Sequence, residues 1–215
     1  MTGLVDGKLF GEAVATLLVI MDPLGTVPLF LGLTGGRSNR ERARMATQAV
    51  GVAFFVISLF AVLGRQILVY LGISVPALQA AGGLLLVLVA LELLTGKQDE
   101  PSAVADVNVA LVPLGTPLLA GPGAIVATIV FVREAQRAEH AVAAYLAIAL
   151  AVVAVHLVLW VALRYSVVII RLIRESGIVL LTRIFGLLLS AIAVQLVADA
   201  IFAFVRGGGN GSVGP

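Results

Sequence analysis

An acid and two prolines interrupt the first long apolar run, in the stretch MDPLGTVPLFL at residues 21–31. A proline inside a helix removes a backbone N–H and clashes with the carbonyl one turn earlier, so the helix opens there. An Asp before a proline is also how a new helix begins, with the acid as its cap. The stretch predicts two half-helices whose freed backbone groups could hold the ammonium and carboxylate of a small zwitterion. The candidate substrate-binding residues here are Asp22, Pro23, Gly25, Thr26 and Pro28.

A second apolar run is interrupted in the same pattern. Pro117-Leu118 and a proline five residues after Pro117 repeat the spacing found in the first run, and Thr116 stands where Asp22 does. The stretch AGPGA at residues 120–124 has no large side chain, so backbone could approach a ligand closely and leave room only for a small one. The candidate substrate-binding residues in this half are Thr116, Pro117, Gly121, Pro122 and Gly123, with Gln195 from the last apolar run.

The composition is that of an integral membrane protein. Of the 215 residues, 60% are hydrophobic and 12% are charged, whereas a soluble domain has about a quarter charged. The absence of cysteine excludes disulfides, thiolate metal sites and a cysteine nucleophile. Six apolar runs reach the roughly 20 residues that a membrane-spanning helix needs. They lie at about 11–33, 44–64, 75–95, 108–132, 141–163 and 178–204.

The two halves of the chain repeat each other, which predicts an inverted fold. GLLLVLVALELLTG from Gly83 matches GLLLSAIAVQLVAD from Gly186 and sets Glu92 opposite Gln195. Because each unit has three helices, the second must insert upside down, as in many secondary transporters. We expect an all-α membrane protein of six transmembrane helices, with helices 1 and 4 broken near mid-membrane. The single transmembrane domain (1–215) then consists of repeat A (10–95), repeat B (108–204) and a flexible Gly-rich tail (205–215).

Basic residues orient these helices. Nine of the fourteen lie in the first, third and fifth connections or just beyond, and five lie on the other side. Since cytoplasmic loops are enriched in Lys and Arg, both termini are expected on the non-cytoplasmic side of a multi-pass cell (inner or plasma) membrane protein. The basic residues do not cluster with aromatics, so nucleic acid is not an expected partner. The lipid bilayer is an expected partner, and a homo-oligomer is left open.

Four stretches carry a resemblance to a known family: DPLGTVPLFLGLTG (22–35), GISVPALQAAGGLLL (72–86), VPLGTPLLAGPGAI (112–125) and LTRIFGLLLSAIAVQLV (181–197). They are similar to signature stretches of the MarC family of bacterial and archaeal inner-membrane proteins, over about residues 10–204. The resemblance implies six helices, a remote similarity to LysE-type exporters, and transport of small neutral amino acids by some relatives. Many members have Asn where this chain has Asp22, and often at Asp199. The acid could carry a proton, bind Na⁺ or only cap a helix.

Other polar residues in the apolar runs have two interpretations each. Glu92 could extend to the membrane interface, which is favoured, or take part in gating. Arg183 could be an interfacial anchor, which is favoured, or form a gate ion pair with Glu92. Asp199 is a further candidate for gating or coupling. His156 is favoured as a helix–helix hydrogen bond over a proton relay. No metal site and no cofactor is expected, apart from Na⁺ or H⁺ as coupling ions.

Several functions compete. The favoured one is a secondary transporter of a small neutral, glycine- or alanine-like amino acid, ion-coupled or exporting. The sequence has no phosphate-binding loop of the GxxxxGK[ST] form. A membrane enzyme would need ionisable groups clustered at one depth, and Asp22 and His156 are isolated, so no enzyme is expected. The alternatives are a non-transporting assembly or partner protein, or an exporter of another small solute.

Overall fold

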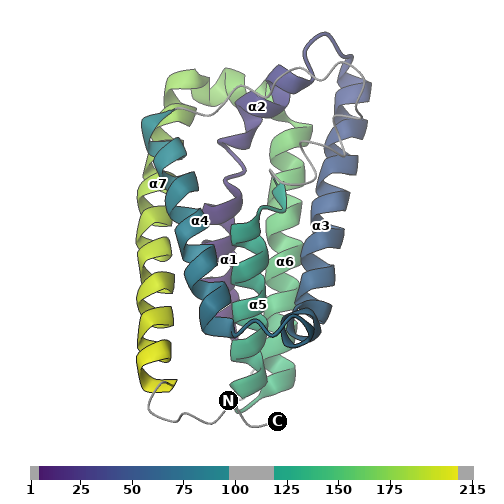
Figure 1. Ribbon diagram of the computed structural model, residues 1–215. Helices are drawn as coiled ribbons and strands as arrows, with labels where there is room; N and C mark the ends of the chain where they lie inside the picture. The colour runs from purple at the N-terminus through teal and green to yellow at the C-terminus, as the bar shows by residue number, and fades with distance from the viewer. Residues whose placement is uncertain (1–4, 97–118, 208–215) are drawn as a thin grey trace.

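The computed structural model describes residues 5–96 and 119–207, and its regular structure there is entirely helical. The helices are α1 (Gly7–Met21), α2 (Thr26–Leu33), α3 (Asn39–Tyr70), α4 (Val75–Thr95), α5 (Pro122–Arg137), α6 (Ala141–Arg164) and α7 (Ser166–Gly207). Figure 1 shows them gathered into one bundle in which the longer helices are roughly aligned, while α2 and the first turns of α7 lie obliquely across its top. The expectation of an all-α protein is confirmed for this part of the chain.

Four of the described helices are long and apolar enough to cross a membrane. They are α4, α6 and the stretches Asn39–Gly64 of α3 and Ser176–Arg206 of α7. Helices α1 and α2 pass the same test together, bent by 45° at a short break, and raise the number to five. The expected fourth span, 108–132, lies partly outside the described residues, and only its second half is seen, as α5. Six spans therefore remain a prediction.

The helices begin at caps that the sequence provides. The Asp6 carboxylate accepts from Lys8 N and Leu9 N at the start of α1. Ser38 and Glu41 form a reciprocal capping box at the start of α3, and Ser74 caps α4 by accepting from Ala77 N. Such caps satisfy backbone N–H groups that have no partner within the helix, which sets where each helix can start.

Two connections are more helical than the sequence suggested. Helix α5 continues through the polar stretch REAQR to Arg137, and α7 begins at Ser166, two residues after α6 ends at Arg164. The connection expected at 164–177 is instead mostly the first part of α7. The helix is interrupted at Arg174, whose φ of 60° and ψ of 160° are not helical. The physical reason is that Glu, Arg, Gln and Leu all favour helix, so polarity alone does not end one.

Helices α1 and α5 occupy the middle of the bundle, with α3 and α6 on one side and α4 and α7 on the other (Figure 1). The start of α1 and the end of α7 lie at the same end of the bundle. The start of α6 is there too, because Asp6 N donates to Ala143 O at 3.3 Å. Outward faces of the surrounding helices expose large apolar side chains, as a lipid-facing surface does. Examples are Phe55, Val62, Leu88, Leu157 and Leu187.

Helices α4 and α7 pack closely through two glycines. A Cβ at Gly83 would lie 2.8 Å from Ala193 O and 2.7 Å from Val197 Cγ2, and one at Gly186 would lie 3.2 Å from Ala90 O and 3.1 Å from Leu94 Cγ. The contacts are reciprocal, since Ala90 and Leu94 follow Gly83 by the same intervals as Ala193 and Val197 follow Gly186. The two helices therefore run antiparallel, and the lack of a side chain at each glycine allows close backbone approach.

Candidate functional site

The first candidate site lies where α1 ends. Asp22 is the C-cap of α1, its N–H donates to Leu18 O at 3.0 Å, and its φ of 36° is in the left-handed region. That conformation costs an L-residue about 1 to 2 kcal/mol, and Asp is one of the few non-glycine residues that adopts it. The interruption expected in the first apolar run is therefore present, with a strained backbone at the acid itself.

The caps at this break differ from the sequence expectation. Asp22 was expected to cap a helix starting at Pro23, but three turn residues intervene and α2 starts at Thr26. The Asp22 carbonyl accepts from Thr26 N at 3.1 Å and from Thr26 Oγ1 at 2.5 Å, and Asp22 Oδ1 accepts from Gly25 N at 3.0 Å. Asp22 thus bridges both half-helices. Pro28 is exposed in the first turn of α2, where its missing N–H breaks no helical bond.

The second oxygen of the Asp22 carboxylate is buried without a partner. Asp22 is only 6% exposed, and its Oδ2 has no hydrogen-bond partner among the described residues. The half-buried Thr182 Oγ1 on α7 has no hydrogen bond of standard geometry there either, although its hydroxyl lies near enough to interact with the Asp22 carboxylate. Both atoms surround the place where Gly25 lacks a side chain, since a Cβ there would overlap Asp22 Oδ2 and lie 2.9 Å from Thr182 Oγ1. A buried polar atom without a partner is costly, so this pair of oxygens is suited to a cationic or hydrogen-bond-donating ligand.

The start of α5 lies beside the end of α1. Gly121 precedes α5 as its N-cap and Pro122 occupies the first turn, which is the usual arrangement for a helix start. A Cβ at Gly123 would lie 3.4 Å from Ile20 Cγ2, two residues before Asp22. The structure therefore brings Gly121 and Gly123 to the region of the first break. Thr116 and Pro117 lie outside the described residues.

The space expected at Gly123 is occupied by a neighbouring helix. A Cβ there would overlap Leu86 Cδ2 and lie 3.0 Å from Leu86 Cγ on α4. Gly123 is buried and allows α4 and α5 to approach closely, as Gly82 also does against Val126. The absence of a side chain at this position therefore serves helix packing.

The remaining candidates lie on outer faces. Gln195 and Asp199 are exposed on α7, and Gln195 Nε2 donates to Asp199 Oδ1 at 2.9 Å. Glu92 on α4 and Arg183 on α7 are also exposed. None of these four has a hydrogen bond or ion pair to Asp22 among the bonds described for residues 5–96 and 119–207.

His156 packs between helices in the middle of α6. The residue is 4% exposed, and its Nδ1 lies 2.8 Å from Val152 O within its own helix. Its ring meets Phe54 of α3 edge-on, at 5.3 Å between centroids and 84° between planes. The ring therefore joins α6 to α3 by aromatic packing.

Sequence reasoning missed Thr182. The residue precedes Arg183 in the stretch LTRIFG, and one helical step of about 100° separates the two side chains. Arg183 is therefore exposed while Thr182 faces the break. A hydroxyl inside an apolar run was the only available signal, and hydroxyls in such runs usually bond to their own helix, as Thr128 does to Ala124 O.

The chain matches a known family of membrane proteins over most of its length. The family described as MarC family integral membrane protein matches residues 7–205 of the chain. The chain belongs to the MarC family. The match includes every helix described above apart from the last two residues of α7. The chain is a multi-pass integral membrane protein, as the apolar helices also indicate.

Relatives in the MarC family match over almost their whole length. The chain is 38% identical to a UPF0056 membrane protein of Methanocaldococcus jannaschii, over 92% of this chain and 98% of the relative. It is 36% identical to a UPF0056 membrane protein of Aquifex aeolicus, over 91% and 93%. It is 32% identical to the UPF0056 inner membrane protein MarC of Citrobacter koseri, over 93% and 96%. Comparison with solved structures gave no significant match.

Proposed function

We propose that this MarC-family chain is a secondary transporter of a small neutral amino acid, with its site at the break between α1 and α2. The observation that carries the proposal is the buried Asp22 Oδ2, which has no hydrogen bond of standard geometry, facing Thr182 Oγ1 across Gly25. A carboxylate inside a membrane span costs about 2.5 to 3.5 kcal/mol on insertion scales, so one without a full set of partners is a candidate for function.

The two oxygens suit the ammonium group of an amino acid. An ammonium has three N–H donors and no acceptor, and here it would donate to Asp22 Oδ2 and Thr182 Oγ1. The adjoining start of α5 would receive the substrate carboxylate, because helix N-termini carry free N–H groups and a partial positive charge. Na⁺ or H⁺ at the same Asp22 oxygen would couple transport to an ion gradient.

The packing of α4 and α7 supports the inverted repeat on which such a transporter is built. Two repeats related by a two-fold axis in the membrane plane make equivalent contacts with each other. A glycine in one repeat then contacts the same position that its equivalent glycine contacts in the other repeat. Gly83 and Gly186 do so, against Ala193 and Ala90. Six spans with both termini on the non-cytoplasmic side fit the position of the start of α1 and the end of α7 at one end of the bundle (Figure 1).

Flux through reconstituted protein tests the proposal. Purified protein in proteoliposomes is expected to move labelled glycine, alanine or serine under an imposed Na⁺ or H⁺ gradient, and the Asp22→Ala variant is expected not to. Wild-type vesicles that take up none of the three under either gradient, in either direction, would rule out the assigned substrate class. Binding of the same amino acids to detergent-purified protein gives a second readout that does not depend on coupling.

A partner or assembly role is the second candidate, and one observation favours it. The hydrogen-bonded pair Gln195 and Asp199 is exposed on the outer face of a membrane-spanning helix. Polar groups at such a position join helices to one another more often than they face lipid. This candidate predicts that Gln195→Leu with Asp199→Leu changes the assembly state on size-exclusion chromatography while flux is absent in all variants.

A further inference from the structure

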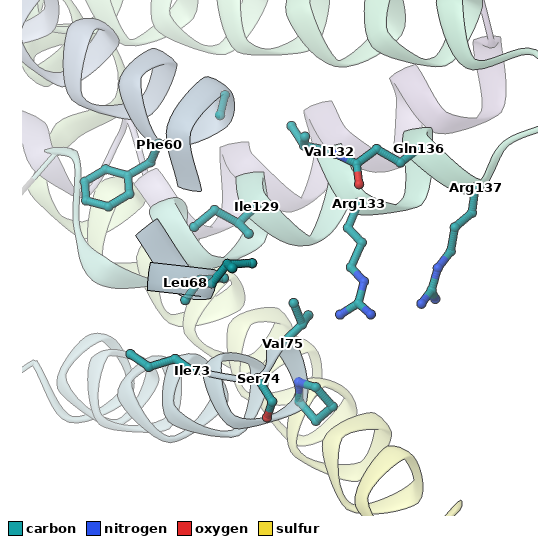
Figure 2. A pocket seen from close by; sticks show the side chains of 13 residues that line it. Phe60, Leu68, Ile73, Ser74, Val75, Ile129, Val132, Arg133, Gln136 and Arg137 are labelled. Atoms are coloured by element: carbon teal, nitrogen blue, oxygen red, sulfur yellow. The ribbon is translucent and has the colours of Figure 1, made fainter. Parts of the chain in front are cut away.

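A hollow of about 490 Å³ lies at the end of the bundle where α3 ends, α4 begins and the last turns of α5 pass between them. Figure 2 shows the guanidinium groups of Arg133 and Arg137 extending from α5 in the same direction, on the side of the hollow where Ser74 and Val75 begin α4. Of the thirteen described residues that line it, these two are the charged ones. The hollow therefore presents positive charge, to which the start of α4 adds a partial charge of the same sign.

A second hollow of about 590 Å³ continues from the first between α3, α5 and α6. The two share Ala61, Val132 and Gln136, so they are contiguous. Its lining is mainly apolar and includes Phe54, Val62, Ile148, Val152 and Val153. Together the hollows form one groove with a cationic end and an apolar remainder.

The charged end lies in the polar stretch that closes α5. Arg133 and Arg137 belong to the stretch REAQR at the end of α5, shortly before the apolar helix α6 begins at Ala141, so we expect them near the lipid headgroups. Most α3 residues that line the second hollow, from Phe54 to Val62, lie within the apolar stretch Asn39–Gly64, where we expect acyl chains, and Gln66 follows that stretch.

We propose that this groove binds an anionic phospholipid, with the phosphate between Arg133 and Arg137 and an acyl chain along the apolar hollow. Arg guanidinium groups bind phosphate oxygens through paired hydrogen bonds, and basic pockets between transmembrane helices hold anionic headgroups. Arg137 also lines a smaller hollow with Lys8, Glu12 and Glu134, where Lys8 Nζ lies 3.7 Å from Glu12 Oε1.

Native mass spectrometry of the full-length protein tests the headgroup contact. Protein is mixed with equal amounts of phosphatidylglycerol and phosphatidylcholine of the same chain length, and retained lipid is counted. Wild type is expected to retain the anionic lipid at least about tenfold more, and the Arg133→Gln/Arg137→Gln variant about equally. The matched control is Arg40→Gln/Arg44→Gln, which removes two exposed arginines of the same spacing at the opposite end of α3 and is expected to keep the preference. A tenfold change corresponds to about 1.4 kcal/mol.

Two further experiments distinguish binding of a lipid from binding of a free phosphate. Ala149 is exposed in the apolar hollow, so Ala149→Phe fills it and is expected to lower retention of phosphatidylglycerol, whereas Ala191→Phe on the exposed face of α7 is not. Glycerol phosphate at the lipid concentration is expected not to displace the lipid. The proposal is overturned if the Arg133/Arg137 variant keeps the preference for phosphatidylglycerol, or if the Arg40/Arg44 control loses it equally. Full retention of phosphatidylglycerol by Ala149→Phe, or its displacement by glycerol phosphate, would also overturn the proposal. If the double variant does not fold, Arg137→Gln alone, at an exposed residue, is expected to reduce the preference, and an unchanged preference there overturns the proposal equally.

Discussion

Gly25→Ala is the sharpest perturbation of the proposed transport site. The added Cβ would overlap Asp22 Oδ2, lie 2.7 Å from Asp22 Cγ and lie 2.9 Å from Thr182 Oγ1. The Asp22 side chain is short, and Gly25 N holds its Oδ1 at 3.0 Å, so the carboxylate cannot keep its place beside a methyl group. The substitution therefore moves the one carboxylate oxygen that the transport proposal depends on.

The size of the effect follows from the hydrogen bond that is lost. A hydrogen bond to an ionised group contributes about 1.5 to 3 kcal/mol, and each 1.4 kcal/mol is tenfold in an equilibrium constant. We expect the affinity for glycine and alanine to fall by about tenfold or more. We also expect the midpoint of thermal unfolding to fall, because the break between α1 and α2 loses a bond that orders its turn.

Labelled-glycine flux into proteoliposomes measures the effect, and Gly32→Ala is the matched control. Gly32 lies in the same short helix α2 with nothing within 4 Å of an added Cβ, so the same substitution is expected to leave flux unchanged. Its stability is expected to stay level or rise slightly, as when a glycine in a compatible conformation is replaced by alanine. Wild-type flux and affinity in Gly25→Ala, or an equal loss in Gly32→Ala, would refute the placement of the site.

Three other predictions address the site, the packing and the orientation. Thr182→Val is expected to reduce flux, because the hydroxyl lies beside the Asp22 carboxylate, while Thr182→Ser is expected to keep flux. Unchanged flux in the valine variant contradicts this. Gly123→Ala is expected to lower the unfolding midpoint by overpacking against Leu86, and Leu86→Ala is expected to recover part of that loss in a double-mutant cycle; strictly additive losses would show that the two do not meet. Because the chain has no cysteine, a single introduced cysteine can report which side of the membrane it lies on. A cysteine in place of Thr2 is expected to react with an impermeant maleimide from outside the cell, and one in place of Arg40 only after the cells are opened. The reverse pattern means that the orientation is inverted.

Local sequence patterns were sufficient for the class of protein and for the first break. Apolar runs of spanning length predicted the membrane helices, and the Asp-Pro-Leu-Gly stretch predicted that the first run opens at Asp22, which is where α1 ends. The likeness between the stretches from Gly83 and Gly186 predicted an inverted repeat, which stays a prediction, and those two glycines exchange matching contacts. Hydropathy and helix breaking act over a few neighbouring residues, so they can be deduced from the sequence.

Only the tertiary structure decided which faces meet. Thr182 was not predicted to face the Asp22 carboxylate, Leu86 was not predicted to fill the space beside Gly123, and Gln195 was expected at the site but lies with Asp199 on an outer face. The reason is physical: a soluble helix marks its buried face with an apolar stripe, whereas a helix in lipid is apolar all round and carries no such mark. The sequence alone therefore determined that these helices lie in a membrane and that the first one opens at an acid, while close packing at glycines decided which side chains surround the opening.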